Sequence, residues 1–523
     1  MKKHSSTIDM SKNIFLKTIS CLLLLSAFIT LSPQLSAAPS AKFNPFIAPG
    51  TLTESSVTLL WDKQVETGNA VYEIYLNNKP YGTTRKTNYT ITKLLPNTQY
   101  TVKIVASQNK ETVAMNTIVF KTTVKGKVYN ILDFGAKDDT LVKNTRAIQA
   151  AIDACTEGGT VYIPKGTYIS GALFLKSNMT LYIEKDAVLK GSVSVDDYLP
   201  MIPNRFEGWE MKTYASLLNA GTLSRNGGYS VTNLRITGEG TLEGGGKKLG
   251  DAMIKAEGIR SRGRLLLLMN CQDVSISGIT LTQPPSWTLH YIYSDNISCH
   301  GLRIITRGIR NGDGIDPDSS TDSYIFNCSF DTGDDCIAIK SGKNPEGFYV
   351  GKPTKNVRVT DCDFIYGHGI SIGSEMSGGV SDVLIQDCQA GNLLNGMQIK
   401  GTKERGGYVR NVTVSNCQLM KITVFSALNY NNDGEAAPEV PVFENFVFRN
   451  IDMKDAKTTE PVMIINGFKE AHHLRNLTFS KIVLPDGAKI LINDAEKATF
   501  TNVKTVSGAK PVYTVNNSTE IVY

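Results

Sequence analysis

A short repeated pattern in the second half of the chain restricts the possible folds more than any other feature of the sequence. Each copy begins with Asn or Asp, continues with alternating apolar and polar residues, and closes on Cys or an apolar residue. Successive copies lie 23 to 34 residues apart, and they close at Ile279, Leu302, Cys328, Cys362, Cys388, Cys417, Ile451 and Ile482. One strand per repeat at this spacing is typical of a solenoid, and the alternation predicts a parallel β-helix.

The cysteines of this pattern fall in one slot of consecutive coils. Coils of a parallel β-helix stack with strands roughly 4.8 Å apart, so equivalent positions form ladders. Ile fills the same slot in the last two copies, which indicates an apolar ladder, since free Cys behaves as a small hydrophobe. Eight of the nine cysteines lie beyond residue 38. An even number also permits disulfides, and a bond between Cys336 and Cys362 is one such alternative.

The first 38 residues have the composition of a secretory signal peptide. Four Lys accompany an apolar stretch that runs from Ile19 to Ile29, and the small residues Ser36, Ala37 and Ala38 follow. An uncleaved anchor helix is the alternative, but the stretch is short for a bilayer span. We therefore predict cleavage near residue 38 and a secreted or periplasmic protein with no membrane partner after cleavage.

The net charge gives little indication of a partner. The formal charge is +6, and residues 1–38 account for half of it through four Lys and one Asp. Charged residues make up 20% of the chain and hydrophobic residues 41%, which is typical of a soluble globular protein. The sequence contains no basic run, so we expect no nucleic acid partner.

Residues 43–125 have the pattern of a small all-β domain. Short alternating runs are separated by turn signals at residues 77–80 and 96–97. Residues 95–102 resemble the tyrosine-corner segment of fibronectin type III domains, and Trp61 lies where those domains place a core Trp. The resemblance implies a β-sandwich, which serves either as a carbohydrate- or partner-binding module or as a spacer.

The β-helix is predicted to occupy residues 128–523. A helix is expected at residues 145–155, where apolar residues recur at helical spacing, with Asn144 as N-cap and Gly158 after its end. We expect this helix to cover the open N-terminal end of the solenoid, because exposed strand edges invite aggregation.

Four polar clusters interrupt the apolar pattern on consecutive coils, at residues 311–316, 333–336, 367–371 and 398–400. Asp334 and His368 each follow the ladder residue of their own coil by six positions. Equal offsets place the two side chains in one slot, about one coil apart. Asp313 and Lys400 extend the group to the coil before and the coil after.

Adjacent carboxylates such as Asp334 and Asp335 repel each other. Repulsion raises the pKa of one of them, which gives a proton donor beside a carboxylate base. Glycoside hydrolysis needs this division of labour. A single Asp-Gly pair is more often a turn, and residues 316–318 lack the spacing of a calcium loop. The combination on successive coils is what indicates catalysis.

These motifs resemble those of polygalacturonases of glycoside hydrolase family 28. Residues 311–316 read NGDGID, as in the family's Asn-x-Asp-Gly-x-Asp motif, residues 333–336 read GDDC, and residues 367–374 read GHGISIGS. The resemblance extends over about residues 128–485. It implies an all-β, right-handed parallel β-helix. It also implies inverting hydrolysis, without metal or cofactor, of α-1,4-linked galacturonic acid in pectic polysaccharide or oligogalacturonides.

The resemblance also implies a role for each catalytic candidate. Asp334 is expected to be the general acid, and Asp313 and Asp335 are expected to hold and activate the water. His368 is expected to support the site and to tune Asp334.

Four further residues are expected to bind substrate: Asn311, Gln398, Lys400 and Tyr430. By the resemblance Lys400 contacts a substrate carboxylate, and Tyr430 stands thirty residues later, about where the family has a tyrosine. Gln398 departs from the family, whose motif is usually Arg-x-Lys. Gln cannot offer a carboxylate the charge and the two parallel hydrogen bonds of Arg.

The departure at Gln398 leaves a modified pectin, such as xylogalacturonan or rhamnogalacturonan, as an alternative substrate. A pectate lyase on the same fold is a second alternative and a non-catalytic adhesin-like β-helix is a third, although neither explains the four clusters. The N-terminal module and an insertion at residues 343–355 resemble bacterial exo-acting members. We therefore expect exo action, while endo action stays open.

Overall fold

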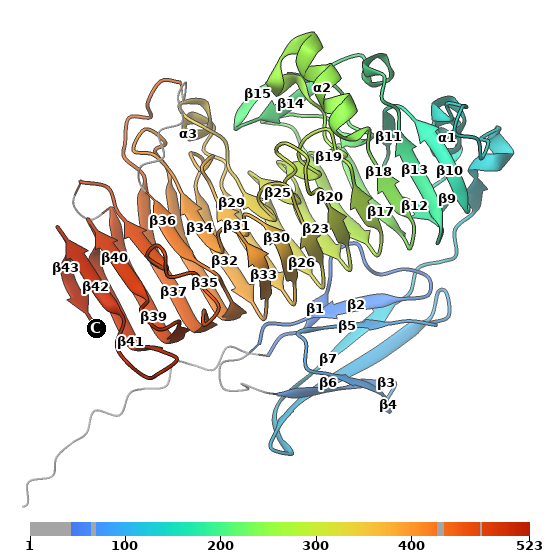
Figure 1. Ribbon diagram of the computed structural model, residues 1–523. Helices are drawn as coiled ribbons and strands as arrows, with labels where there is room; N and C mark the ends of the chain where they lie inside the picture. The colour runs from blue at the N-terminus through green and yellow to red at the C-terminus, as the bar shows by residue number, and fades with distance from the viewer. Residues whose placement is uncertain (1–42, 64–69, 426–433, 471–472) are drawn as a thin grey trace, which may run out of the picture. The chain divides into compact units, whose positions relative to one another are not determined.

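A computed structural model of the protein describes residues 43–63, 70–425, 434–470 and 473–523. From residue 128 onward the chain forms three parallel sheets of 14, 8 and 12 strands, which it visits in turn as it winds (Figure 1). Residues from Tyr129 to Val503 contribute to one apolar core between them. This confirms the predicted parallel β-helix. The predicted signal peptide and the candidate Tyr430 lie outside the described residues.

Each sheet is built from strands of successive coils. The 14-stranded sheet contains β8 (Val128–Asn130), β9 (Gly159–Ile163), β12 (Met179–Ile183), β17 (Val231–Gly238), β20 (Cys271–Ser277), β23 (Asp295–His300), β26 (Thr321–Phe326), β29 (Thr354–Thr360), β32 (Val380–Gln386), β35 (Tyr408–Gln418), β37 (Val442–Asp452), β39 (Leu474–Leu484), β41 (Glu496–Thr505) and β43 (Thr519–Val522). The 8-stranded sheet contains β10 (Gly166–Ser170), β13 (Ala187–Gly191), β18 (Thr241–Glu243), β21 (Thr280–Thr282), β24 (Arg303–Ile305), β27 (Ser329–Asp331), β30 (Asp363–Gly367) and β33 (Gln389–Leu393). The 12-stranded sheet contains β11 (Leu173–Leu175), β16 (Leu218–Gly221), β19 (Leu266–Met269), β22 (Leu289–Ile292), β25 (Ile315–Asp318), β28 (Ile337–Ile339), β31 (Ile370–Ile372), β34 (Met397–Lys400), β36 (Ile422–Phe425), β38 (Met463–Asn466), β40 (Lys489–Asn493) and β42 (Val512–Asn516).

Residues 46–121 form an antiparallel β-sandwich. One sheet contains β1 (Phe46–Ile47), β2 (Val57–Leu60) and β5 (Asn88–Ile91), and the other contains β4 (Lys79–Thr84), β3 (Val71–Leu76), β6 (Gln99–Gln108) and β7 (Glu111–Lys121). Trp61 is buried against Tyr72, with ring centroids 5.0 Å apart. The Leu95 N–H donates to the Tyr100 hydroxyl over 2.8 Å, as in a tyrosine corner. The predicted fibronectin III-like sandwich is confirmed.

The helical segments are short. They are α1 (Thr145–Ala154), α2 (Gly246–Glu257), α3 (Glu346–Val350) and the 3₁₀ turns η2 (Ile131–Phe134), η3 (Val195–Tyr198) and η4 (Ile259–Ser261). A two-stranded hairpin of β14 (Ile202–Phe206) and β15 (Trp209–Thr213) stands beside them.

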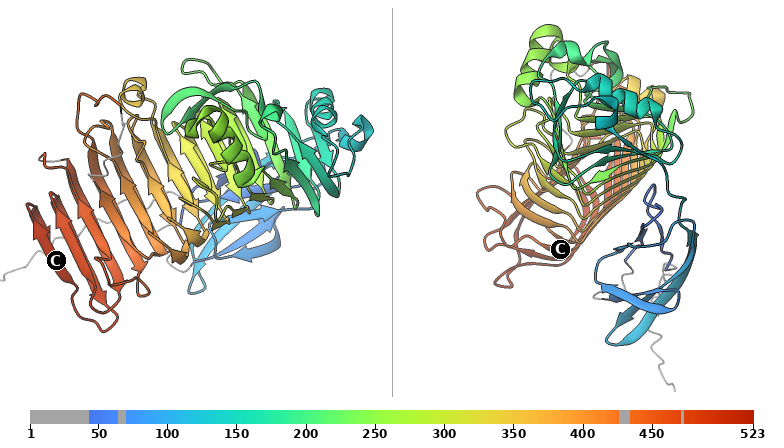
Figure 2. Two further views of the ribbon diagram at one scale, coloured as in Figure 1. Left: turned by 45° about the horizontal axis from the view of Figure 1, so that its top comes forward. Right: turned by 90° about the vertical axis from the view of Figure 1, so that its right-hand side faces the viewer.

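Helix α1 lies at the end of the solenoid that holds the first strands (Figure 2). Its residues Ile148, Ala151 and Ile152 are buried in the common core. Asn144 occupies the N-cap position, as predicted, but its side chain makes no cap hydrogen bond because its Oδ1 accepts from the Lys137 N–H at 2.7 Å. The expected end of the helix at Gly158 is wrong, since the C-cap is Cys155. The helix ends at residue 154, since the next residue is extended and buried, so Gly158 belongs to the turn before β9.

The cysteine ladder exists as predicted. All eight cysteines among the described residues are free and buried. Cys417 pairs with Ile451 across the parallel sheet, and Ile451 pairs with Ile482. The alternative of a disulfide at Cys336 is therefore not the arrangement found among these residues.

Each coil bends where the repeat begins, which explains why that position is Asn or Asp. Asn356, Asp382, Asn411, Asn445 and Asn476 have φ between 56° and 61°. This left-handed conformation is costly for most side chains, and Asn and Asp tolerate it best after Gly. The same amides connect coils, since Asn411 Nδ2 donates to Asp382 Oδ1 at 3.0 Å and Asn445 Nδ2 donates to Asn411 Oδ1 at 3.1 Å.

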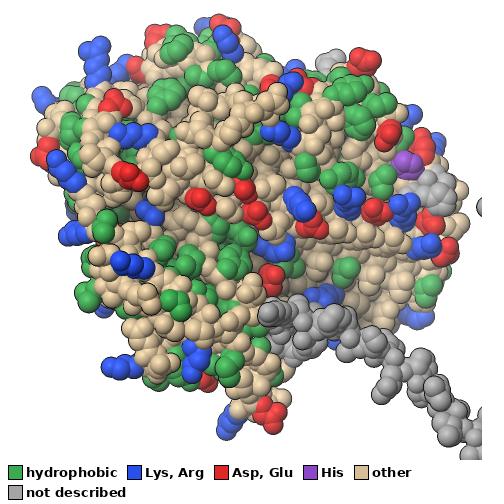
Figure 3. Space-filling view, turned by 180° about the vertical axis from the view of Figure 1, so that it is seen from behind, with side chains coloured by type: hydrophobic (Ala, Val, Ile, Leu, Met, Phe, Trp, Pro, Cys, Tyr) green, Lys and Arg blue, Asp and Glu red, His purple; other side chains and the backbone are tan. Residues whose placement is uncertain are grey.

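The surface carries both signs of charge. On the face shown in Figure 3, basic and acidic side chains are interspersed and hydrophobic side chains occur in small groups. Among the described residues, every helix is too short or too polar to cross a membrane.

We predict that Asn411→Ala lowers the free energy of unfolding by about 1–2 kcal/mol, because Ala disfavours the left-handed conformation and loses the inter-coil hydrogen bond. Asn411→Gly keeps access to that conformation and loses less. Urea unfolding followed by circular dichroism measures both, with Asn392→Ala on β33 as a control at an ordinary φ. Equal losses for Ala and Gly at residue 411 contradict the conformational explanation.

Candidate active site

A cleft of about 360 Å³ is lined by five of the predicted residues, which come from several coils: Asn311, Asp313, Asp334, Asp335 and Lys400. His368 contacts two of these residues but is not part of the lining. Asp313 precedes β25, Asp334 and Asp335 precede β28, and Lys400 ends β34, all on the 12-stranded sheet. The complete lining is Glu207, Arg260, Trp287, Asn311, Asp313, Asp334, Asp335, Lys340, Lys343, Gly373, Ser374, Glu375 and Lys400. The stacking of β25, β28, β31 and β34 as neighbours confirms that the four motifs lie on consecutive coils.

The chain leaves its regular register just before these motifs. The pairing of β27 with β30 shifts after Phe330, which makes a bulge of the kind often found beside functional sites. The glycines around His368 permit a close approach of coils. Gly367 has φ 134° and Gly369 has φ 93°, and a Cβ atom there would lie 2.1 Å from Thr332 Oγ1 and 2.2 Å from the Gly396 carbonyl oxygen, respectively.

Asp334 and His368 face each other one coil apart, as the equal offsets predict. His368 Nδ1 lies 3.0 Å from Asp334 Oδ1, and the His368 N–H donates to the Asp334 carbonyl at 2.9 Å. The hydrogen bond to Asp334 raises the pKa of His368 against the opposing effect of burial. Burial raises the pKa of Asp334, but the hydrogen bond and charge of His368, helped by Lys400, outweigh it, so the net shift is downward. The pair therefore favours imidazolium and carboxylate.

Asp335 is held from two sides. Its Oδ1 accepts from the Ser371 hydroxyl at 2.7 Å, and its Oδ2 lies 3.0 Å from Lys400 Nζ. The side chain is only 5% exposed, whereas that of Asp334 is 25% exposed. The two adjacent carboxylates therefore have different surroundings, and Asp334 is the more accessible.

Asp313 is the third carboxylate of the group. Burial raises its pKa well above the ordinary value, and the charges of Asp316 and Asp334 add to the shift. Its Oδ1 has no hydrogen-bond partner within the described residues. Asn311, two residues earlier, lines the same cleft and accepts a 2.8 Å hydrogen bond from Arg262 Nη2.

Gln398 lies behind the cleft rather than in its lining. The side chain is buried, and its Nε2 donates to the His368 carbonyl and to the Ser371 hydroxyl, both at 3.4 Å. In the parallel register Gln398 pairs with Ser371 on β31. The structure therefore places Gln398 against the residues that hold His368 and Asp335.

Five charged residues of the cleft lining were not predicted from the sequence as site residues: Glu207, Arg260, Lys340, Lys343 and Glu375. Lys340 is buried, with Nζ 3.3 Å from Glu375 Oε2 and 3.8 Å from Asp316 Oδ1. Burial lowers the pKa of Lys340, yet Glu375 and Asp316 outweigh it and the net shift is upward. The sequence did contain a signal for Lys340. It follows the apolar run 337–339 at a position that the alternation places outside the apolar core, six residues after Asp334.

Asp316, the last residue of the first motif, lies beneath the cleft. It is fully buried and neither carboxyl oxygen has a hydrogen-bond partner in the described part of the chain. Burial raises the pKa of Asp316 to about 8, although Lys340 and Arg264 oppose the shift.

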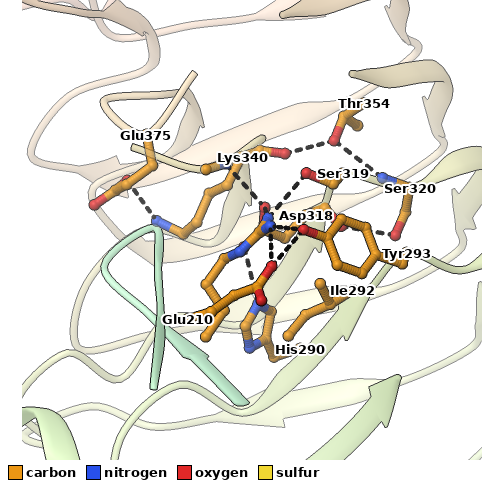
Figure 4. A network of polar contacts seen from close by, with 12 residues as sticks. Glu210, His290, Ile292, Tyr293, Asp318, Ser319, Ser320, Lys340, Thr354 and Glu375 are labelled. Atoms are coloured by element: carbon orange, nitrogen blue, oxygen red, sulfur yellow. Dashed lines mark hydrogen bonds and ion pairs between the residues drawn. The ribbon is translucent and has the colours of Figure 1, made fainter. Parts of the chain in front are cut away.

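A buried network of polar contacts lies beside Asp316 and Lys340, which form the floor of the cleft (Figure 4). Arg205, from the β14–β15 hairpin, places Nη1 2.7 Å from Asp318 Oδ1, and His290 Nε2 lies 3.3 Å from Asp318 Oδ2. Burial lowers the pKa of His290 to about 4. Burial raises the pKa of Asp318, but Arg205 and His290 outweigh it and lower it overall. The hairpin is thus fixed to β25, the strand that also carries Asp316.

Asp334, Asp335 and His368 are also close enough to share an ion, because their ligand atoms lie within 4.8 Å of one another. The donor set suits a divalent cation poorly as it stands. His368 Nδ1 already contacts Asp334, and the Lys400 ammonium already neutralises Asp335. A metal ion would have to displace both contacts.

Carboxylates in unlike surroundings around one cleft are the groups with which glycosidases work. On this solenoid they define a β-helix glycoside hydrolase. The family model described as "Glycosyl hydrolases family 28" matches residues 158–509, so the chain belongs to that family. The model "Fibronectin type III domain" matches residues 46–119.

Similar proteins cover most of the chain. An "Exo-poly-alpha-D-galacturonosidase" from Dickeya chrysanthemi is 27% identical over 93% of this chain and 95% of its own length. A "Probable polygalacturonase" from Vitis vinifera is 34% identical over 62% of this chain and 68% of its own. The solved Yersinia enterocolitica family 28 exopolygalacturonase is 26% identical, covers 91% of this chain and 99% of its own, and superposes with a TM-score of 0.83.

We predict that Asp334→Asn lowers the pKa of His368. The carboxylate favours the imidazolium, so its removal leaves the opposing effects of burial and Lys400. A pH titration of isotope-labelled histidine followed by NMR measures the shift. Asp452→Asn, which removes a carboxylate paired with Lys454 away from the cleft, serves as control. An unchanged or higher pKa of His368 in Asp334→Asn contradicts the pairing.

Proposed function

We propose that this enzyme hydrolyses α-1,4-galacturonosyl linkages of pectic polysaccharide from a chain end, with inversion. The observation that carries the proposal is the arrangement of Asp313, Asp334 and Asp335 on two consecutive coils, with His368 and Lys400 against them. The named relatives act on galacturonan according to their descriptions, and the Dickeya and Yersinia proteins do so as exo-enzymes.

In this mechanism Asp334 protonates the leaving glycosidic oxygen. Asp313 and Asp335 position a water and take up its proton as it attacks the anomeric carbon from the opposite side. The greater exposure of Asp334 supports its role as the group that meets substrate. The hydrogen bonds of Asp335 to Ser371 and Lys400 keep its carboxylate oriented.

The proton must reach Asp334 before catalysis. In the unliganded cleft Asp313 has the raised pKa and Asp334 the lowered one. A substrate carboxylate bound to Lys400 would neutralise one of the cations that lower the pKa of Asp334, and the sugar would exclude water. Both effects favour the protonated form of Asp334 in the complex. Activity should therefore be lost as the pH rises through the pKa of Asp334 in that complex.

A wall on one side of the cleft supports exo action. The turn of the β14–β15 hairpin meets the insertion at residues 343–355, since the Lys343 N–H donates to the Gly208 carbonyl at 3.1 Å and Trp209 Nε1 donates to the Asn344 carbonyl at 3.0 Å. The Glu210 N–H also donates to Glu346 at 3.1 Å. Because these contacts join two insertions from distant coils, a polymer that enters the cleft stops at the wall.

We also propose that the protein is exported. Residues 1–38 form the signal peptide, residues 43–125 the fibronectin-like domain and residues 128–523 the catalytic domain, and the mature enzyme degrades pectin of plant cell walls outside the cytoplasm. N-terminal sequencing of protein recovered from the periplasm or medium tests the cleavage site.

We predict that digests of polygalacturonate release one short product from the outset, with slow loss of viscosity. The product first appears as the β-anomer by NMR, because the attack inverts an α-linkage. Chromatography of parallel digests of rhamnogalacturonan and xylogalacturonan separates the substrate alternatives. A ladder of intermediate oligomers contradicts exo action, and unsaturated uronides formed with calcium contradict hydrolysis.

We predict that Asp334→Asn lowers kcat on the preferred substrate by about 10²–10⁴-fold, since general acid catalysis is worth that much. Asp331→Asn, three residues earlier on β27 and outside the cleft, is the matched control. Both variants should unfold at the temperature of the wild type. Unchanged turnover by Asp334→Asn would show that another group is the acid.

A further inference from the structure

The wall of the cleft carries an arginine that the mechanism above does not use. Arg260 lies on η4, between α2 and β19, and it lines the cleft together with Glu207 and Lys343. Its Nε lies 2.7 Å from Glu207 Oε2, at the turn of the β14–β15 hairpin. Its guanidinium lies over the Trp209 ring, 4.9 Å from the centroid. Two contacts from one hairpin thus fix the plane of the guanidinium.

The outer edge of this guanidinium is free to bind a ligand. Within the described residues Nε alone makes a hydrogen bond, and neither terminal nitrogen does so. The side chain is 37% exposed and belongs to the cleft lining. The planar guanidinium therefore has N–H donors available whose geometry matches the two oxygens of a carboxylate.

The backbone that carries Arg260 is fixed to the catalytic coil. Arg262 Nη2 donates to Asn311 Oδ1 at 2.8 Å and Arg262 Nη1 donates to the Arg310 carbonyl at 3.0 Å. Arg264, two residues further, is fully buried and lies over Trp287 at 4.2 Å. Two buried arginines therefore hold the η4 segment beside the loop of Asp313, while Arg260 projects into the cleft.

The electrostatic surroundings also favour an anion here. Lys343 lies over the same Trp209 ring, with Nζ 4.3 Å from the centroid. Glu207 pairs with Arg260 through Nε alone, and Glu375 on the floor lies 3.3 Å from Lys340. A uronate carboxylate that approaches the wall therefore meets the unfilled N–H donors of the terminal nitrogens of Arg260.

We propose that Arg260 binds the carboxylate of the galacturonate unit at the end of the substrate chain. This inference rests on the proposed function, and it identifies the residue that recognises the substrate at the closed end of the cleft. Arg260 is a specificity-determining residue and takes no part in proton transfer. Trp209 and Glu207 orient it.

The test compares trigalacturonate with two analogues, in each of which the carboxyl group of one terminal unit is reduced to an alcohol. In one of the analogues the neutral unit lies at the wall. For the wild type, the kcat/KM of this analogue should be about 10- to 100-fold below that of trigalacturonate, because a charged hydrogen-bond pair is lost. Arg260→Gln should show the same loss on trigalacturonate, chiefly in KM, and should no longer distinguish that analogue. Arg260→Lys should fall between, because it keeps the charge and loses the fork.

The matched control is Arg475→Gln on β39, whose Nε also binds a glutamate, Glu444, at 2.9 Å on a comparably exposed surface away from the cleft. This variant should keep the wild-type preference among the three oligomers. Thermal unfolding of each variant checks that the wall remains folded.

A binding measurement separates this inference from the proposed function. Calorimetric titration of trigalacturonate into Asp334→Asn and into Asp334→Asn with Arg260→Gln needs no turnover. The double variant should bind trigalacturonate more weakly than Asp334→Asn, and the two proteins should bind the analogue with a neutral wall-side unit equally. This result supports the role of Arg260 even if galacturonan proves not to be hydrolysed. Equal binding by both proteins, or an equal loss for all three oligomers, overturns it.

Discussion

A left-handed bend in every coil is the constraint on which the rest of the molecule depends. The chain can add coils in register only if each corner turns within one residue, and the backbone conformation of that residue excludes most side chains. Asn or Asp fills the corner in the coils from Asn178 to Asn476, and Lys497 and Glu520 fill it in the last two. Asn411 also binds the corners on both sides, at Asp382 and Asn445. The same register brings Asp313, Asp334, His368 and Lys400 to one face, so the site is a product of coil stacking.

Beneath that face the protein buries charge that a purely apolar coil would not. Asp318 with Arg205, and Lys340 with Glu375, are paired ions in a dry interior, and His290 and Asp316 lie beside these pairs. Removal of one member leaves an uncompensated charge, which is strongly destabilising. The same pairs fix the hairpin to the floor of the cleft. Fixed, dry dipoles and charges are what a site needs to stabilise charge that develops during a reaction.

Local pattern was enough to predict the coils and the core of the site. The period, the ladder through Cys417 and Ile451, and the equal offsets of Asp334 and His368 depend on stacking alone, which the sequence repeats coil by coil. The buried side of Gln398 could not be predicted, since it depends on which neighbours its amide finds across β31. Arg260 and the hairpin contacts escaped prediction because they join segments that no periodicity relates, whereas Lys340 lies on the repeat itself and its partners are on the neighbouring coils. The N-cap position of Asn144 was predicted correctly, but its side chain binds the nearby loop at Lys137 instead of the helix.

The free cysteines have a consequence for where such a chain can acquire its shape. Eight buried thiols fill apolar slots without a bond between any two of the described ones, so no oxidant takes part in assembly. The coils can then form in a reducing or an oxidising compartment alike, because the described residues hold no disulfide for glutathione to reduce. The redox state of the compartment therefore sets no condition on the folding of the described part of the chain.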